Sequence, residues 1–194
     1  MRGQAHTLEA FAAAALLVTS LLFAMQVTAV TPLSASTSSQ GIENQQRTAT
    51  EDALRIADGE DELGPTVLHW DNETRAFHGL EPGEQYAPGE LDTALGERLD
   101  ATFADRGIAY NLYVHYPTDG GARESRRVVH SGEPSDHAAS ATRLLTLYGD
   151  DELRGPDGSA TGVSLIDSES FYVEPAGESS FYAVVEVEVV VWRL

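Results

Sequence analysis

The 194-residue chain contains no cysteine and no lysine. Without cysteine it can form no disulfide, no thiolate metal site and no cysteine nucleophile, so a folded domain has to be stabilised by its apolar core. Its 12 basic residues are all arginine, and they stand against 31 acidic residues, which gives a net charge of −19. A chain so poor in cations offers no basic face for phosphate groups, which excludes DNA and RNA as partners.

The acidic residues are dispersed along the chain rather than gathered in one run. An acidic surface without lysine suits a protein that stays hydrated in concentrated salt, where charges are screened over roughly 3 Å. Recruitment of cations or of a basic partner is the alternative, but dispersed acids favour the first interpretation. We therefore expect a halophilic protein.

Motifs that carry known catalytic chemistry are also missing. There is no glycine-rich phosphate loop, no G-x-S-x-G elbow and no pair of histidines at helical spacing. His130 and His137 flank Glu133 and Asp136, but this spacing matches no established ligand pattern. The sequence therefore predicts a protein that is not an enzyme and that binds no cofactor and no metal.

A long hydrophobic run lies near the N-terminus. Residues 10–30 are apolar apart from Thr19, Ser20, Gln26 and Thr28. As a helix, the segment from Leu8 to Val30 would be about 34 Å long at roughly 1.5 Å per residue, enough to cross a hydrocarbon core of about 30 Å. We expect a transmembrane helix over residues 4–33. Because Arg2 precedes this helix and an acidic domain follows it, the positive-inside tendency predicts a single-pass protein of the cell membrane, with a cytoplasmic N-terminus and an extracellular C-terminal domain.

Glu9 stands at the start of this segment and needs an explanation, because an ionised side chain costs on the order of 2–3 kcal/mol in mid-membrane and usually has a polar partner. Arg2, Gly3 and Gln4 precede it in the sequence Arg-Gly-Gln-Ala-His-Thr-Leu-Glu-Ala-Phe. This start resembles the class III signal of archaeal type IV pilins and pilin-like proteins, and it is also similar to the start of secreted proteins of salt-loving archaea. One feature departs from the pilin pattern: Glu9 is the sixth residue after Gly3, where the family norm is the fifth.

The resemblance implies that a prepilin peptidase cuts between Gly3 and Gln4, that residues 1–3 are a leader peptide, and that Glu9 neutralises the terminal amine of a neighbouring subunit. It also implies that the N-terminal helix assembles with other pilin-like subunits. Two alternatives stay open: an uncleaved signal anchor, and a secretory signal peptide that is cut near residues 27–29. The position of Glu9 and the length of the apolar run argue against the signal peptide.

Helical spacing of apolar residues continues beyond the hydrophobic run. It predicts an amphipathic helix over residues 34–58, and Gly59 supplies a stop signal. Residues 59–194 then form the extracellular domain. A further helix is expected over residues 90–105, closed by Gly107.

The rest of this domain shows the alternation of strands. Alternating apolar residues predict strands over 108–116 and 181–192. Residues 117–121 have the composition of a turn, so residues 125–131 are expected to form the returning strand of a hairpin. Residues 137–148 fit both a helix and a strand, and their Thr and Tyr content favours the strand. The expected fold class is α+β, with a long N-terminal hydrophobic transmembrane helix followed by a globular domain that has a mainly antiparallel β-sheet and one or two packed helices.

Asn72 begins the glycosylation sequon Asn-Glu-Thr in a polar stretch, which makes it a candidate for modification on an exported protein. Taken together, these features favour a membrane-anchored, pilin-like structural subunit, a minor pilin or pseudopilin, of an archaeal type IV filament or secretion-type system. Its expected partners are the membrane, other pilin-like subunits and a prepilin peptidase. The alternative is a single-pass, membrane-anchored binding domain at the cell surface with no role in a filament.

Overall fold

The computed structural model describes the backbone of residues 2–118, 120–177 and 180–193. Within helix α1 (Arg2–Gly59) it describes the side chains of residues 9–25 and those from residue 40 onward. The chain divides into two compact units, Met1–Ile42 and Glu43–Leu194.

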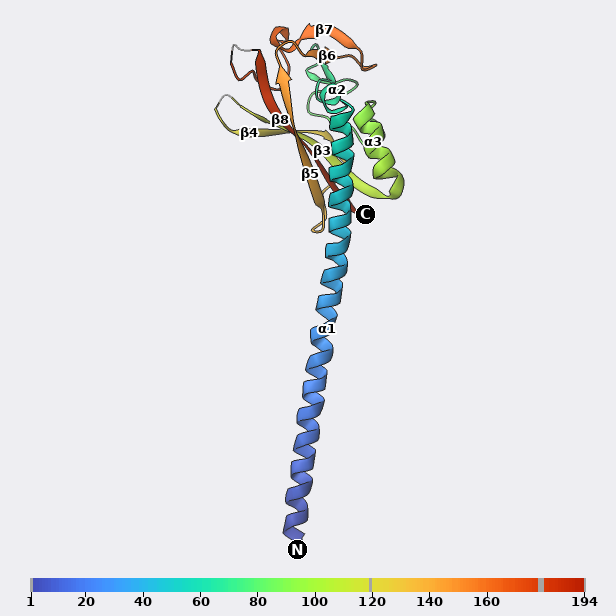
Figure 1. The fold of residues 1–194 in the computed structure, drawn as a ribbon, viewed down its shortest axis with the longest axis vertical. Helices are drawn as coiled ribbons and strands as arrows, with labels where there is room; N and C mark the ends of the chain where they lie inside the picture. The colour runs from blue at the N-terminus through green and yellow to red at the C-terminus, as the bar shows by residue number, and fades with distance from the viewer. Residues whose placement is uncertain (1, 119, 178–179, 194) are drawn as a thin grey trace. The chain divides into compact units, whose positions relative to one another are not determined.

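The first unit is the N-terminal part of α1, which is drawn in blue in Figure 1. No helix in the described part of the chain is both long and apolar enough to cross a membrane. The prediction of a transmembrane helix over residues 4–33 is therefore wrong. The predicted single-pass localisation, with a cytoplasmic N-terminus and an extracellular domain, is wrong for the same reason.

The second unit contains a four-stranded antiparallel sheet in the order β4-β3-β8-β5 (Figure 1). Its strands are β3 (Ile108–Pro117), β4 (Arg123–Val129), β5 (Ala139–Tyr148) and β8 (Phe181–Arg193). The strands predicted over 108–116, 125–131 and 181–192 are confirmed, with ends that differ by one or two residues. The strand interpretation of residues 137–148 is also confirmed, because β5 pairs with β8 along its whole length.

Strand β8 lies inside the sheet, with β3 on one side and β5 on the other. Its alternate residues from Ala183 to Val191 are at most 1% exposed. Glu186 and Glu188 lie between them on the opposite face, where both are only partly buried. The alternation therefore fixes the register of the central strand, since a slip of one residue would bury both carboxylates.

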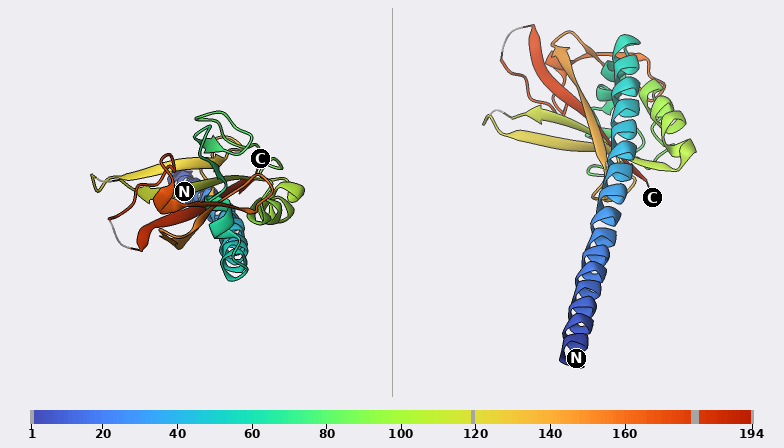
Figure 2. Two further views of the ribbon diagram at one scale, coloured as in Figure 1. Left: turned by 90° about the horizontal axis from the view of Figure 1, so that it is seen from above. Right: turned by 60° about the horizontal axis from the view of Figure 1, so that its bottom comes forward.

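The helices of the second unit complete one apolar core with the sheet. The end of α1, helix α2 (Leu63–Val67), helix α3 (Ala94–Thr102) and the short helix η1 (Ala104–Arg106) lie beside the strands in both views of Figure 2. The fully buried side chains of this core come from both helices and strands, and include Leu54, Leu63, Leu95, Leu99, Phe103, Tyr110, Leu112 and Leu147. Helix α1 ends at Gly59, as predicted.

The helix predicted over residues 90–105 is confirmed in type but begins four residues later. Thr93 caps α3 by accepting a hydrogen bond from the backbone N–H of Gly96 (3.2 Å), and a side-chain acceptor of this kind starts a helix. Gly107 follows η1 with φ of 70°, a left-handed conformation that glycine adopts without strain.

Several short elements were not predicted. They are the hairpin of β1 (Trp70–Asp71) and β2 (Ala76–Phe77), the hairpin of β6 (Glu152–Arg154) and β7 (Ala160–Ser164), and the short helix η2 (Leu165–Asp167). Strands of two to five residues are too short to show a period. The fold class is therefore α+β with antiparallel sheets, and the predicted class is wrong in joining such a domain to a transmembrane helix.

Gly96 provides a test of how closely α3 is packed. A Cβ at this position would lie 2.1 Å from the carbonyl oxygen of Leu91, which is backbone and cannot move aside cheaply. Alanine normally stabilises a helix relative to glycine, but here we expect Gly96→Ala to lower the free energy of unfolding by about 1–3 kcal/mol, because the core becomes overpacked. Urea denaturation of the full chain would measure this loss.

Gly64→Ala is the matched control for this experiment. Gly64 lies in α2, and a Cβ there would contact Asp61 at an ordinary 3.6 Å. We expect this variant to be neutral or slightly more stable. A Gly96→Ala protein as stable as Gly64→Ala would contradict the packing argument.

Candidate functional site

Most of the exposed large apolar side chains in the described part of the chain belong to one stretch of α1, Ala10–Met25, which we name the apolar segment. Their exposed fractions range from 58% to 78%. They are Phe11, Leu16, Leu17, Val18, Leu21, Leu22, Phe23 and Met25. An exposed apolar surface of this kind marks an interaction site on a folded protein.

The local sequence explains why the apolar segment is helical. Ala10 and Ala12–Ala15 are the strongest helix formers, and the leucines that follow lose little rotamer freedom in a helix. Thr19 donates its hydroxyl hydrogen to the carbonyl oxygen of Ala15 at 2.7 Å. Because this polar group is satisfied within the helix, it adds no demand for a polar partner outside it.

The exposed apolar side chains surround the helix rather than forming one stripe. At about 100° per residue, the eight positions leave no sector of the circumference wider than about 100° without a large apolar side chain. A helix that is apolar on one face needs one partner surface, whereas a helix that is apolar all round has to be buried on every side. The segment therefore fits an environment of several neighbouring helices.

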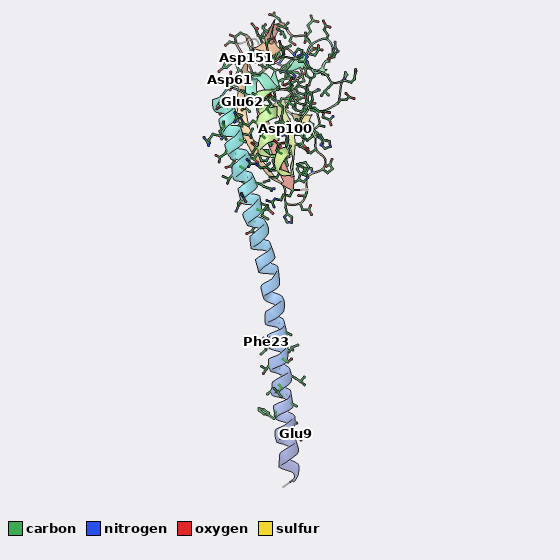
Figure 3. The ribbon with its side chains drawn as sticks, turned by 90° about the vertical axis from the view of Figure 1, so that its right-hand side faces the viewer. Glu9, Phe23, Asp61, Glu62, Asp100 and Asp151 are labelled. Carbon is green, nitrogen blue, oxygen red and sulfur yellow. The ribbon has the colours of Figure 1, made fainter. Side chains whose placement is uncertain are left out.

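Glu9 lies immediately before the apolar segment and is exposed; Figure 3 shows it on α1 together with Phe23. Gly3 and Gln4 lie outside the residues whose side chains the structure describes. Cleavage between them, and the role of Glu9 toward a neighbouring amine, stay predictions.

Asn72 lies in the turn between β1 and β2 and is half-buried. Its amide oxygen accepts hydrogen bonds from the hydroxyl groups of Ser168 (2.7 Å) and Ser170, two residues that are distant in the sequence. These contacts hold the side chain in one orientation. Glycosylation of Asn72 stays a prediction.

The histidines and acids around residues 130–137 do not come together in the structure. His137 contacts Glu43 through Nδ1 at 2.8 Å, and His130 lies 3.3 Å from the Arg127 guanidinium. Among the described residues, no three side chains of the types that bind metals are grouped within reach of one ion.

One histidine that the sequence did not single out is buried in the core. His69 is 3% exposed, its ring lies 4.8 Å from that of His78 in an edge-on arrangement, and its Nδ1 has no hydrogen-bond partner. Burial, followed by the nearby His78, lowers the pKa of His69 to about 4. Only the tertiary structure could reveal this, because a lone histidine in the sequence carries no sign of its depth.

The chain belongs to a family of unknown function (DUF7288), whose model matches residues 2–191. No curated protein and no solved structure matches the chain. The family match covers both units, so the apolar segment and the α+β domain belong to one family architecture.

The buried His69 makes stability depend on pH. Since its pKa is lowered in the folded state, the unfolded chain binds the proton more tightly, and stability that is complete above pH 6.5 is lost as the pH falls toward 4. We expect this residue alone to remove on the order of 3 kcal/mol of unfolding free energy between pH 7 and pH 4. His69→Gln, which does not titrate, should flatten the profile measured by urea denaturation across this range.

His137→Gln is the control, because the side chain of His137 is 70% exposed. An exposed pair contributes little to stability, so this variant should keep the pH dependence of the wild-type protein. An unchanged slope for His69→Gln would show that burial of His69 does not control the acid side of the profile.

Proposed function

We propose that this protein is a pilin-like structural subunit of an archaeal type IV filament or secretion-type assembly, in which the apolar segment of α1 packs among the same segments of neighbouring copies. The observation that carries the proposal is the exposure of large apolar side chains around the whole circumference of this segment. A dimer would cover one side of the helix only, so the partners have to be several.

The energy available from this packing is sufficient for assembly. Burying a large apolar side chain yields about 1.5–3 kcal/mol, so eight partly exposed side chains provide on the order of 10 kcal/mol per subunit. Association costs about 4–15 kcal/mol in lost translational and rotational freedom, which makes the balance favourable once each helix has more than one neighbour.

The composition of the segment supports close packing between helices. Ala10 and Ala12–Ala15 form a stretch of small side chains, which let helix backbones approach one another. The larger side chains of the segment, the leucines and Phe23 that follow, fill the wider spaces between neighbours. The start Arg-Gly-Gln-Ala-His-Thr-Leu-Glu-Ala-Phe, with its likeness to pilin signals, supports the same assignment.

Leu17→Asp tests the proposal directly. Leu17 is 73% exposed in the middle of the apolar segment, and an aspartate there would place an unpaired carboxylate between packed helices. We expect the wild-type chain to form ordered assemblies of uniform diameter, visible by electron microscopy and sedimenting far ahead of a monomer. The variant should shift predominantly to monomer.

Ile166→Asp is the matched control, since Ile166 is 57% exposed but lies in η2 of the α+β domain. It should assemble like the wild type. A wild-type chain that stays monomeric, or a Leu17→Asp chain that assembles as well as Ile166→Asp, would refute the proposal.

Glu9→Gln tests the pilin-like character of the assembly rather than its existence. If Gly3 precedes the cut, the intact mass of the protein recovered from its host should lack residues 1–3, and the new amine should meet the carboxylate of Glu9 on a neighbour. Glu9→Gln should keep this processed mass but assemble poorly, because it removes the charge of the proposed pair. Gly3→Leu tests the cleavage itself and should keep the full-length mass. A Glu9→Gln protein that assembles normally would show that no such charge pair forms.

A further inference from the structure

A groove of about 550 Å³ lies on the α+β domain between strand β4 and the loop Gly83–Gln85. Its lining includes Tyr113, Tyr116, Arg126 and Arg127, together with Glu84 and Glu124. Aromatic residues and arginine are enriched at recognition sites relative to the rest of a protein surface. The volume is within the range of ligand sites in proteins.

Both arginines are held in place by aromatic rings. The Arg126 guanidinium lies 5.0 Å from the ring centre of Trp70 and 5.2 Å from that of Tyr172, and its buried Nε has no hydrogen-bond partner. The Arg127 guanidinium lies 5.6 Å from the ring of Tyr113. Stacking of this kind fixes the position of a guanidinium without neutralising its charge, because the rings carry no opposite charge.

Neither arginine has its charge neutralised by an ion pair. The ion pairs between described residues engage Arg55, Arg98 and Arg123 but neither Arg126 nor Arg127. In a chain with a net charge of −19, Arg126 and Arg127 are also the only two arginines that are adjacent in the sequence. Their charge is therefore available to an anionic ligand.

The two carboxylates of the groove, Glu84 and Glu124, form no ion pair with either arginine in the described part of the chain. Glu84 and Glu124 are exposed, whereas the arginines are half-buried. Each carboxylate also accepts a hydrogen bond from a group other than the arginines, Glu84 from the backbone N–H of Glu81 (3.0 Å) and Glu124 from the hydroxyl of Tyr116 (3.3 Å).

The groove runs along an edge of the sheet that is only partly used. Strand β4 pairs with β3 on one side, and on its other side the described part of the chain supplies a single extended residue, Tyr86, which forms a parallel bridge with Val129. The N–H of Tyr86 donates to the oxygen of Val128, and the N–H of His130 donates to the oxygen of Tyr86, both at 2.9 Å. The chain itself thus shows that this edge accepts an extended backbone.

We propose that the groove binds an extended acidic peptide, which adds to the edge of β4 beside Arg123–Arg127 and continues the pairing that Tyr86 begins. Side chains of adjacent strand residues point to opposite faces, and cross-strand neighbours share a face. Two successive acidic residues of the peptide therefore meet Arg126 on one face and Arg127 on the other. The backbone supplies affinity, and the two arginines supply specificity for carboxylates.

The test uses the full-length protein and the peptide Thr-Val-Glu-Glu-Val-Thr. Trp70 stacks on Arg126, so its fluorescence reports binding in the groove. We expect saturable binding that weakens with added salt, and a loss of about tenfold or more in affinity for Arg127→Gln and for Arg126→Gln. Arg143→Gln on β5, outside the groove, should bind like the wild type.

Further ligands test whether the charges and the backbone of the peptide are both recognised. The peptide Thr-Val-Gln-Gln-Val-Thr should bind about tenfold or more weakly, since it lacks the charges. A backbone N-methylated acidic peptide should also bind weakly, because it cannot pair with β4.

Because Arg126→Gln removes a stacked residue, its melting temperature has to be compared with that of the wild type. If Arg126→Gln does not fold, the affinity of Arg127→Gln tests the proposal. Equal binding of the acidic and amide peptides, or preferential binding of oligogalacturonate, would overturn the proposal.

Discussion

The burial of one face of strand β8 is the constraint on which the domain depends. From Ala183 to Val191 every second side chain is at most 1% exposed, and the strand is hydrogen-bonded on both sides. A slip of one residue would exchange these side chains for Glu186 and Glu188, so the alternation excludes every register that is offset by an odd number of residues. The positions of β3 and β5 follow from the pairing, and the helices then have to cover the valine face that the sheet presents.

Polar contacts at the margin of this core determine how the helices close it. Arg98 of α3 forms ion pairs with Glu62 and with Glu60 (2.6 Å) just beyond the end of α1, and the pairing lowers the pKa of Glu62. Tyr110 of β3 donates its hydroxyl hydrogen to Asp100 of α3 at 2.8 Å. The ion pairs join α3 to the short segment between α1 and α2, and the hydrogen bond joins α3 to the sheet. These two contacts orient α3.

The sequence predicted the elements whose patterns are long, and it missed the elements that are too short to show a pattern. Strand β8 alternates over its whole length, whereas β1 and β2 have two residues each and show no period. Residues 137–148 fit the spacing of both a helix and a strand, and their pairing with β8 shows that they form a strand. The sequence identified the apolar segment, but the prediction of a transmembrane helix there was wrong. Apolar composition alone does not determine what surrounds a helix. The sequence did not indicate Arg126 or Arg127, because their stacking partners lie elsewhere in the chain: Trp70 and Tyr172 for Arg126, and Tyr113 for Arg127.

The distribution of charge separates the two units in a way that bears on assembly. The first 42 residues contain one arginine and one glutamate, so the whole net charge of −19 belongs to the α+β domain. Domains of one sign repel one another over a distance of about 10 Å at 0.1 M salt and about 3 Å at 1 M. In the proposed assembly the attraction of the apolar segments therefore has to exceed this repulsion. Added salt strengthens assembly, because it screens the repulsion between the domains while leaving apolar burial intact. Repulsion between the acidic domains thus confines association to the apolar segments. The groove beside β4 differs from the rest of the acidic surface, because arginines line it.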